Sequence, residues 1–172
     1  MTLKQYQKEA KRTMPDLGSS MNMLHMRMGV VTEIGEFVDQ IKKHLIYKKP
    51  LDVVNLGEEV ADIMWYLVNE MTLTGEVAFD DSSITSTKNI DLVESVDSIL
   101  KFQEMYLYKG EEYTYANLIR ELMYITSELH LDFDVILQNN INKLKIRFPD
   151  KFSEDLAINR NLTLERIELE KN

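Results

Sequence analysis

The clearest pattern in the chain is a stripe of hydrophobic residues that repeats with the period of an α-helix. It runs through residues 17–47, where the main apolar positions are Val30, Ile34, Phe37, Val38, Ile41 and Leu45. This spacing predicts a long amphipathic helix with one buried face. The segment Lys48-Lys49-Pro50 should end it, because proline cannot continue a helix and cations are favourable at the negative end of the helix dipole.

A second helix is predicted over residues 52–73. Asp52 precedes the apolar run and has the short polar side chain that caps helix N-termini. The apolar positions again have helical spacing: Val53, Leu56, Val60, Ile63, Met64, Leu67, Val68 and Met71. A turn at Pro50 would place this helix beside the first as an antiparallel neighbour.

The remaining chain is also predicted to be helical, with one polar interruption. Residues 74–88 are rich in Ser, Thr and Asp and contain Gly75, which is typical of a loop. Further helices are expected over 3–13, 89–108, 113–130 and 132–147, with a short one over 162–170. Three prolines and six glycines interrupt the chain, and no segment alternates like a β-strand. We therefore expect an all-α fold, a helical bundle of about five main helices in one domain.

Composition and charge narrow the classes of protein. The 172 residues include 29 Asp and Glu against 20 Lys and Arg, a net charge of -9. This excess of acid argues against a nucleic-acid-binding protein, which needs cations to meet phosphates. No apolar run approaches the ~18 residues of a membrane span, and the first ten residues lack a signal-peptide core. The absence of cysteine excludes disulfides and fits a reducing compartment, so we expect a cytoplasmic protein with neither membrane nor nucleic-acid partners.

Two pairs of acidic residues lie on the two long predicted helices. Glu33 and Glu36 are three residues apart on the first helix, as are Glu59 and Asp62 on the second. Residues three apart project from the same side of a helix, so four carboxylates would meet between packed antiparallel helices. Such charges repel one another unless a cation balances them, and all-oxygen ligands suit Mg²⁺ or Mn²⁺.

The alternative for these pairs is an ordinary solvated helix face, because acidic pairs at this spacing are common. The chain contains others, among them Glu36/Asp39, Glu94/Asp97 and Glu165/Glu168. The acids of the second helix differ because they belong to a narrow polar seam on an otherwise apolar helix, formed by Asn55, Glu59, Asp62, Tyr66 and Asn69. No histidine follows a glutamate at the Glu-x-x-His spacing of di-iron bundles, which argues against such a centre.

Two glycines, Gly29 and Gly35, lie inside the first long helix. A glycine within a helix costs about 1 kcal/mol relative to alanine. Each either allows a partner backbone or a ligand to approach closely, or is simply tolerated at that position.

Positive charge gathers near the C-terminus of a chain that is otherwise short of it. The cations are Lys143, Arg147 and Lys151, which lie close to helical spacing with the polar Asn140, and then Arg160. Lysine and arginine hold phosphate oxygens, and a guanidinium does so with two parallel hydrogen bonds. The alternative is a solvated basic helix end that complements the helix dipole.

Together these segments resemble the MazG-like nucleoside triphosphate pyrophosphohydrolases of the all-α NTP pyrophosphatase superfamily. Glu33-Ile-Gly-Glu36 and Glu59-Val-Ala-Asp62 match that family's E-x-x-E and E-x-x-D signature. The stretch NNINKLKIRFPDKF, in a closing segment over about 132–160, resembles its final motif, with Phe148 where tyrosine is usual. Residues 74–112 depart from the compact family pattern as an insertion, which leaves subfamily and base preference open.

The resemblance implies Mg²⁺-dependent hydrolysis of a nucleoside triphosphate to the monophosphate and pyrophosphate. It implies that Mg²⁺, or Mn²⁺, is ligated by Glu33, Glu36, Glu59 and Asp62. It implies that Lys143 and Arg147, with Lys151 or Arg160, hold the phosphates, and that Asn140 adds a polar contact. One acid would act as the general base, and Glu36 is our first choice.

Two functions remain open at this level. One is the hydrolase, acting on canonical or aberrant (deoxy)nucleotides; the other is a non-catalytic helical module that binds a nucleotide or a partner protein. Trp65 and Tyr66 could stack on a base, although a core position is the simpler expectation for Trp65. We also expect a homo-oligomer, a dimer or tetramer as is common in that family, with its interface near residues 89–130. The base, the sugar and the number of metal ions are not determined by the sequence.

Overall fold

The computed structural model describes residues 1–78, 91–109 and 113–171, and all regular elements in these ranges are α-helices. They are α1 (Leu3–Arg12), α2 (Ser19–Tyr47), α3 (Val53–Thr74), α4 (Leu92–Tyr108), α5 (Tyr115–Glu128), α6 (Phe133–Arg147), α7 (Glu154–Ile158) and α8 (Leu162–Leu169). The expected all-α class is confirmed.

The helix boundaries agree with the sequence prediction to within a few residues. Asp52 caps α3 as expected, because its carboxylate accepts a hydrogen bond of 3.0 Å from the backbone N–H of Asn55. Most of the loop expected over 74–88, and part of the insertion expected over 74–112, lie outside the described residues. The short helix α7 was not predicted, and none of its five residues is buried, so it has no apolar stripe to reveal it.

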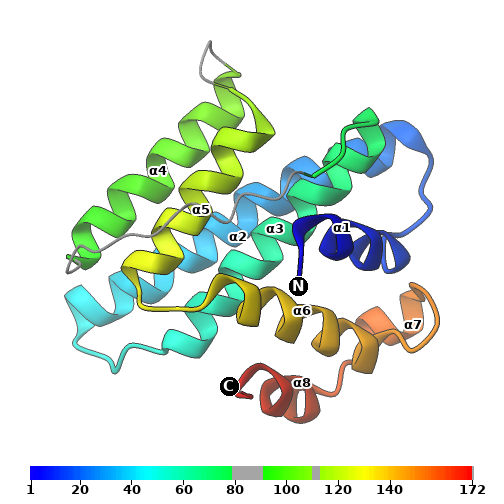
Figure 1. Ribbon diagram of the computed structural model, residues 1–172. Helices are drawn as coiled ribbons and strands as arrows, with labels where there is room; N and C mark the ends of the chain where they lie inside the picture. Colours follow the sequence, from blue (N-terminus) through cyan, green and yellow to red (C-terminus); the bar gives the residue numbers. More distant parts are fainter. Residues whose placement is uncertain (79–90, 110–112, 172) are drawn as a thin grey trace.

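Helix α3 is the centre of the bundle (Figure 1). It packs along α2, as the predicted hairpin requires, and also against α1, α5 and α6. Helix α4 packs on α2 and α5, and α8 packs on α6. Between Leu56 and Met71, every residue of α3 is buried except Glu58, Asp62 and Tyr66. These three exceptions are four residues apart, so they form one narrow accessible strip on a helix that is otherwise enclosed.

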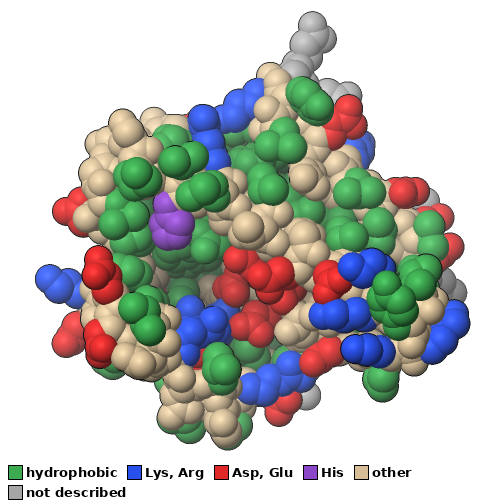
Figure 2. Space-filling model, turned by 180° about the vertical axis from the view of Figure 1, so that it is seen from behind, with side chains coloured by type: hydrophobic (Ala, Val, Ile, Leu, Met, Phe, Trp, Pro, Cys, Tyr) green, Lys and Arg blue, Asp and Glu red, His purple; other side chains and the backbone are tan. Residues whose placement is uncertain are grey.

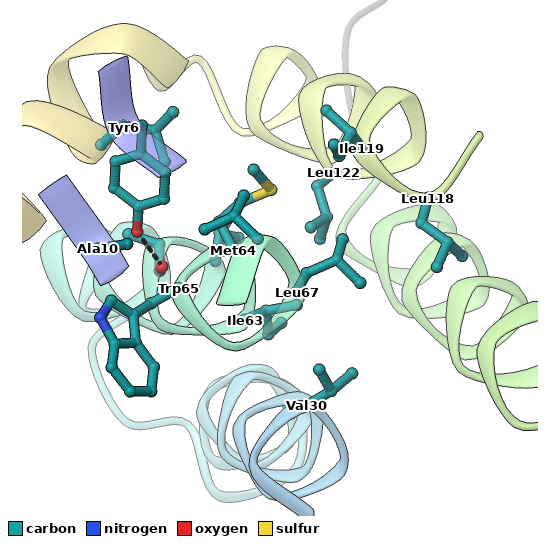
Figure 3. Close-up of a cluster of buried hydrophobic side chains, with 14 of the residues drawn as sticks. Tyr6, Ala10, Val30, Ile63, Met64, Trp65, Leu67, Leu118, Ile119 and Leu122 are labelled. Carbon is teal, nitrogen blue, oxygen red and sulfur yellow. Dashed lines mark hydrogen bonds between the residues drawn. The ribbon is translucent and has the colours of Figure 1, made fainter. Parts of the chain in front are cut away.

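The core around α3 combines side chains from several helices (Figure 3). Tyr6 and Ala10 come from α1, Val30 from α2, and Leu122 from α5. Tyr6 is fully buried, and its hydroxyl lies 2.9 Å from the carbonyl oxygen of Ala61. Because an unpaired buried hydroxyl is costly, this hydrogen bond ties α1 to α3 in a defined register.

The surface of α4 carries an apolar stripe. Val93, Leu100 and Leu107 are seven residues apart and have exposed fractions of 50%, 46% and 53%. They lie in the region where the homo-oligomer interface is expected, and the homo-oligomer itself stays a prediction. Among the helices that the structure describes, none is both long enough and apolar enough to cross a membrane.

Gly29 on α2 gives the Tyr66 ring of α3 the room it needs. A β-carbon built at Gly29 would lie 2.2 Å from Cε1 of Tyr66, far inside van der Waals contact. A β-carbon at Gly35 would meet no atom of the described residues within 4 Å. The close approach considered for both glycines is therefore present at Gly29, where a side chain rather than a backbone comes near.

We expect Gly29→Ala to lower the free energy of unfolding by about 1–3 kcal/mol, because the added methyl group must displace the Tyr66 ring. Gly35→Ala, in the same helix, should raise it by up to about 1 kcal/mol, because alanine loses less backbone entropy on folding. Urea denaturation followed by circular dichroism measures both values. Equal effects of the two substitutions would contradict the assignment.

Candidate functional site

Three of the four predicted metal ligands converge between α2 and α3. Glu33 of α2 and Glu59 and Asp62 of α3 each offer a carboxylate oxygen, and these oxygens lie within 4.8 Å of one another. We call these three residues the acid triad. Glu59 is buried, with 5% of its surface exposed, whereas Glu33 and Asp62 are half-buried. Glu36, the fourth predicted ligand, is exposed one turn along α2 and lies outside the triad.

The triad is electrostatically unbalanced when it holds no cation. Burial and then the charges of Asp62, Glu33 and Glu36 raise the pKa of Glu59 to about 8. Burial and then the charges of Asp62 and Glu36 raise the pKa of Glu33 to about 7. The side-chain amide of Asn55 donates a hydrogen bond of 2.6 Å to Glu59, which offsets only part of this cost.

This donor set fits a divalent cation. Carboxylate oxygens from two neighbouring helices are ligands that Mg²⁺ and Mn²⁺ prefer. A bound cation would remove the repulsion that raises these pKa values, so the residues present have a physical reason to bind one. The structure thus supports an acidic site that can hold a metal ion, without specifying which ion.

Asp62 is the triad member that forms an ion pair with a buried lysine. Lys143 of α6 is 1% exposed, and its ammonium lies 2.8 Å from both carboxylate oxygens of Asp62 and 3.0 Å from Glu58. Burial by itself lowers the pKa of Lys143, but the charges of Asp62 and Glu58 outweigh it and raise that pKa. The ammonium is therefore retained as the partner of two carboxylates.

Asn140 has the same role one turn earlier on α6. It is fully buried, and its amide donates a hydrogen bond of 2.5 Å to Asp62. Its side-chain oxygen accepts a hydrogen bond of 2.9 Å from Tyr6. The sequence predicted that Asn140 and Lys143 contact phosphates, but the structure places both behind Asp62, where they orient that carboxylate instead of lining the adjoining pocket.

A pocket of about 430 Å³ lies against the triad. Its charged lining consists of Glu33, Glu36, Glu58, Glu59, Asp62, Arg147 and Arg160. On the face shown in Figure 2, acidic side chains gather beside a hollow, and basic side chains lie next to them. The structure therefore brings two predicted phosphate-binding cations, Arg147 and Arg160, to the same pocket as the predicted metal ligands. Lys151, also predicted, is exposed on the segment after α6 and is not part of the lining.

One residue of this region was missed by the sequence analysis. Glu165 of α8 is 2% exposed and accepts hydrogen bonds from both Arg147 and Arg160. Burial raises its pKa, but the two arginines lower it more, so the pKa of Glu165 lies below its usual range. In the sequence, Glu165 was noted only as one member of the Glu165/Glu168 pair. The spacing of an acidic pair does not indicate whether its members are buried.

Part of the remaining pocket wall is aromatic. His25, Trp65 and Tyr66 line it, with ring centroids 4.9 Å apart for Trp65 and Tyr66 and 5.5 Å apart for His25 and Tyr66. Trp65 is 8% exposed and its indole N–H donates to the hydroxyl of Thr13 at 2.9 Å. Trp65 is thus mainly a core residue, as the simpler expectation had it, although its edge reaches the pocket.

Comparisons with protein-family models, with curated proteins and with solved structures found no match for this chain.

We expect the stability of the cation-free protein to fall as the pH rises from about 4.5 to about 8. In this range the unfolded chain, whose glutamates have a pKa of 4.5, releases a proton that the folded chain retains on Glu59. Glu59→Gln keeps the Asn55 partner and removes the charge, so it should match the wild type at pH 4.5 and melt higher at pH 8, by roughly 3 °C or more. Thermal melts in chelator across this range measure the difference, which must grow with pH.

We expect Lys143→Met to lower the free energy of unfolding by about 3 kcal/mol, because it leaves Asp62 and Glu58 without their buried partner. Lys145→Met is the matched control, since Lys145 makes an exposed ion pair with Glu9 that should contribute little. Urea denaturation of both variants measures the difference. If Lys143 were instead a free phosphate ligand, the two variants would be equally stable.

Proposed function

We propose that this chain is a MazG-like, Mg²⁺-dependent nucleotide pyrophosphohydrolase that converts nucleoside triphosphates, including deoxynucleotides, to the monophosphate and pyrophosphate. The observation that carries the proposal is the acid triad and two guanidiniums on one pocket of about 430 Å³. A nucleotide polyphosphate bound with a divalent cation needs both kinds of group: oxygen ligands for the cation and donors for its anionic oxygens.

The acid triad would hold the cation, through Glu33, Glu59 and Asp62. When bound there, Mg²⁺ would polarise a phosphoryl group and lower the pKa of a water ligand. Asp62 needs a defined orientation for this role, and Lys143 and Asn140 supply it through their hydrogen bonds. Because Lys143 also balances part of the charge of Asp62, the site has less unpaired negative charge than its count of acids implies.

Glu36 is our candidate for the general base. It lines the pocket but lies outside the triad, so its carboxylate is not needed to hold the cation. An exposed carboxylate one helical turn from the ligands can accept a proton from an attacking water, a contribution that is typically about 10²–10⁴-fold in rate.

The arginines and the aromatic wall would hold the rest of the substrate. Arg147 and Arg160 line the pocket and can donate to phosphate oxygens as negative charge develops. Tyr66, with His25 and the edge of Trp65, offers an apolar surface against which a base could pack. An enzyme of this kind would work in the cytoplasm, where nucleotides and Mg²⁺ are abundant, which agrees with the lack of cysteine.

We expect a panel of ribo- and deoxynucleoside triphosphates to yield pyrophosphate, and not orthophosphate, only when Mg²⁺ or Mn²⁺ is present. Glu36→Gln should lower kcat by about 100-fold or more without lowering the melting temperature, because Glu36 is exposed and its charge only adds to the repulsion at the triad. Glu94→Gln is the matched control: it alters an exposed glutamate at the same spacing from a second acid, on α4, and should leave kcat unchanged.

The outcome of this assay also separates the two functions left open by the sequence. Nucleotide binding by calorimetry, without turnover over hours, would favour the non-catalytic module. Neither binding nor turnover with any nucleotide and either cation would refute the proposed function.

A further inference from the structure

Helix α8 carries a buried carboxylate that has two cations as partners. Glu165 accepts hydrogen bonds from Arg147 through Nε at 3.0 Å and also through Nη2. It accepts from Arg160 through Nη2 at 2.8 Å and through Nε at 3.3 Å. The two arginines belong to different parts of the chain, the end of α6 and the segment between α7 and α8, so this one carboxylate brings them together.

The arrangement leaves both charge and donors available. Two guanidiniums share one ionised carboxylate, so one positive charge is not balanced within the cluster. Each guanidinium uses its Nε and Nη2 edge for Glu165, and the Nη1 nitrogen of neither makes a hydrogen bond to the described residues. Both arginines nevertheless line the pocket that holds the acid triad, whereas Glu165 does not. The two arginines thus contribute to the pocket wall, and the carboxylate that binds them lies outside that wall.

Helix α8 is itself anchored to the helix that carries two triad residues. Arg166, the residue after Glu165, makes two hydrogen bonds of 2.9 Å and 3.0 Å to the carboxylate of Asp52. Asp52 is the N-cap of α3, which carries Glu59 and Asp62. Adjacent residues of α8 thus connect the arginines on one side and the start of α3 on the other, which couples the position of the cations to that of the acids.

We propose that Glu165 is a positioning residue: it fixes the guanidiniums of Arg147 and Arg160 so that their free edges face the polyphosphate chain of a substrate bound at the acid triad. This inference rests on the proposed function. Arginine side chains that are ordered in advance lose less entropy when substrate binds, and fixed donors stabilise developing charge better than mobile ones.

Because Glu165 is charged, its substitution distinguishes a positioning role from an effect on the long-range attraction between the pocket and an anionic substrate. Removing the carboxylate makes the pocket more positive, so the long-range attraction of a polyphosphate should increase or stay the same. The orientation of the guanidiniums, in contrast, should be lost. A positioning role therefore predicts a fall in kcat with little change in KM. A role in bulk attraction predicts a change in KM with little change in kcat.

The test compares Glu165→Gln with Glu168→Gln, which alters a carboxylate on the same helix whose ion-pair partner is Lys171. We expect kcat for nucleotide hydrolysis to fall at least tenfold in E165Q and E168Q to keep the wild-type kcat and KM. In low-salt buffer the KM of E165Q should stay within threefold of the wild type, because the increased attraction of the substrate offsets the lost orientation of the arginines. Arg160→Lys should reproduce the loss of kcat, since lysine keeps the charge but cannot make the two-bonded contact. If E165Q does not fold, R160K still tests the proposal. A kcat within twofold of the wild type in E165Q or R160K would overturn the proposal.

A second measurement does not depend on turnover. Binding of inorganic tripolyphosphate with Mg²⁺ is measured by calorimetry in 0.5 M NaCl, where long-range attraction is largely screened. We expect E165Q to bind at least fivefold more weakly than the wild type, and E168Q to bind equally well. Equal or tighter binding by E165Q, or no binding by the wild type, would overturn the positioning role. If tripolyphosphate binding follows this expectation and no nucleotide is hydrolysed, the proposed function fails while the role of Glu165 in holding polyphosphate stands.

Discussion

Mutual repulsion among three carboxylates is the constraint on which the described site depends. Glu33, Glu59 and Asp62 are held together between α2 and α3 by the packing of two apolar helix faces, against the repulsion among their charges. The raised pKa values of Glu33 and Glu59 express the resulting cost. The core around α3 must therefore supply the free energy that keeps the acids close, and a cation is the simplest partner that would reduce this cost.

The neighbouring elements distribute charge around this centre in two different ways. On one side, Lys143 and Asn140 of α6 bind Asp62 from within the protein, at full burial. On the other side, Arg147 and Arg160 reach the pocket, and Glu165 of α8 holds them. The same helix α6 thus contributes one cation that is used internally and one that is available to a ligand. Burial decides between the two roles, because both residues are basic and only four positions apart in the sequence.

The C-terminal segment is needed to complete the site, although it is only weakly patterned. Helix α8 has two buried residues, and both are glutamates, Glu165 and Glu168. Its attachment includes specific charged contacts, namely Glu165 with two arginines and Arg166 with the N-cap of α3. Such contacts join residues far apart in the sequence, so they leave no periodic signal in the chain.

The sequence by itself determined the main helices, their order and the four acids from which the triad is drawn. Hydrophobic spacing is a local property, and it is sufficient to predict the α2–α3 hairpin and the side of each helix that carries Glu33, Glu59 and Asp62. Hydrophobic spacing could not distinguish Glu36 from the triad residues. Whether a carboxylate one turn further along α2 reaches the triad depends on how the two helices pack. Only the tertiary structure decided that Lys143 binds Asp62 instead of facing the pocket, that Gly29 makes room for Tyr66 and Gly35 does not, and that Glu165 is buried between two arginines. The physical reason is that charge pairing, close approach and burial are relations between distant segments, whereas periodicity and capping act within a few residues of one another.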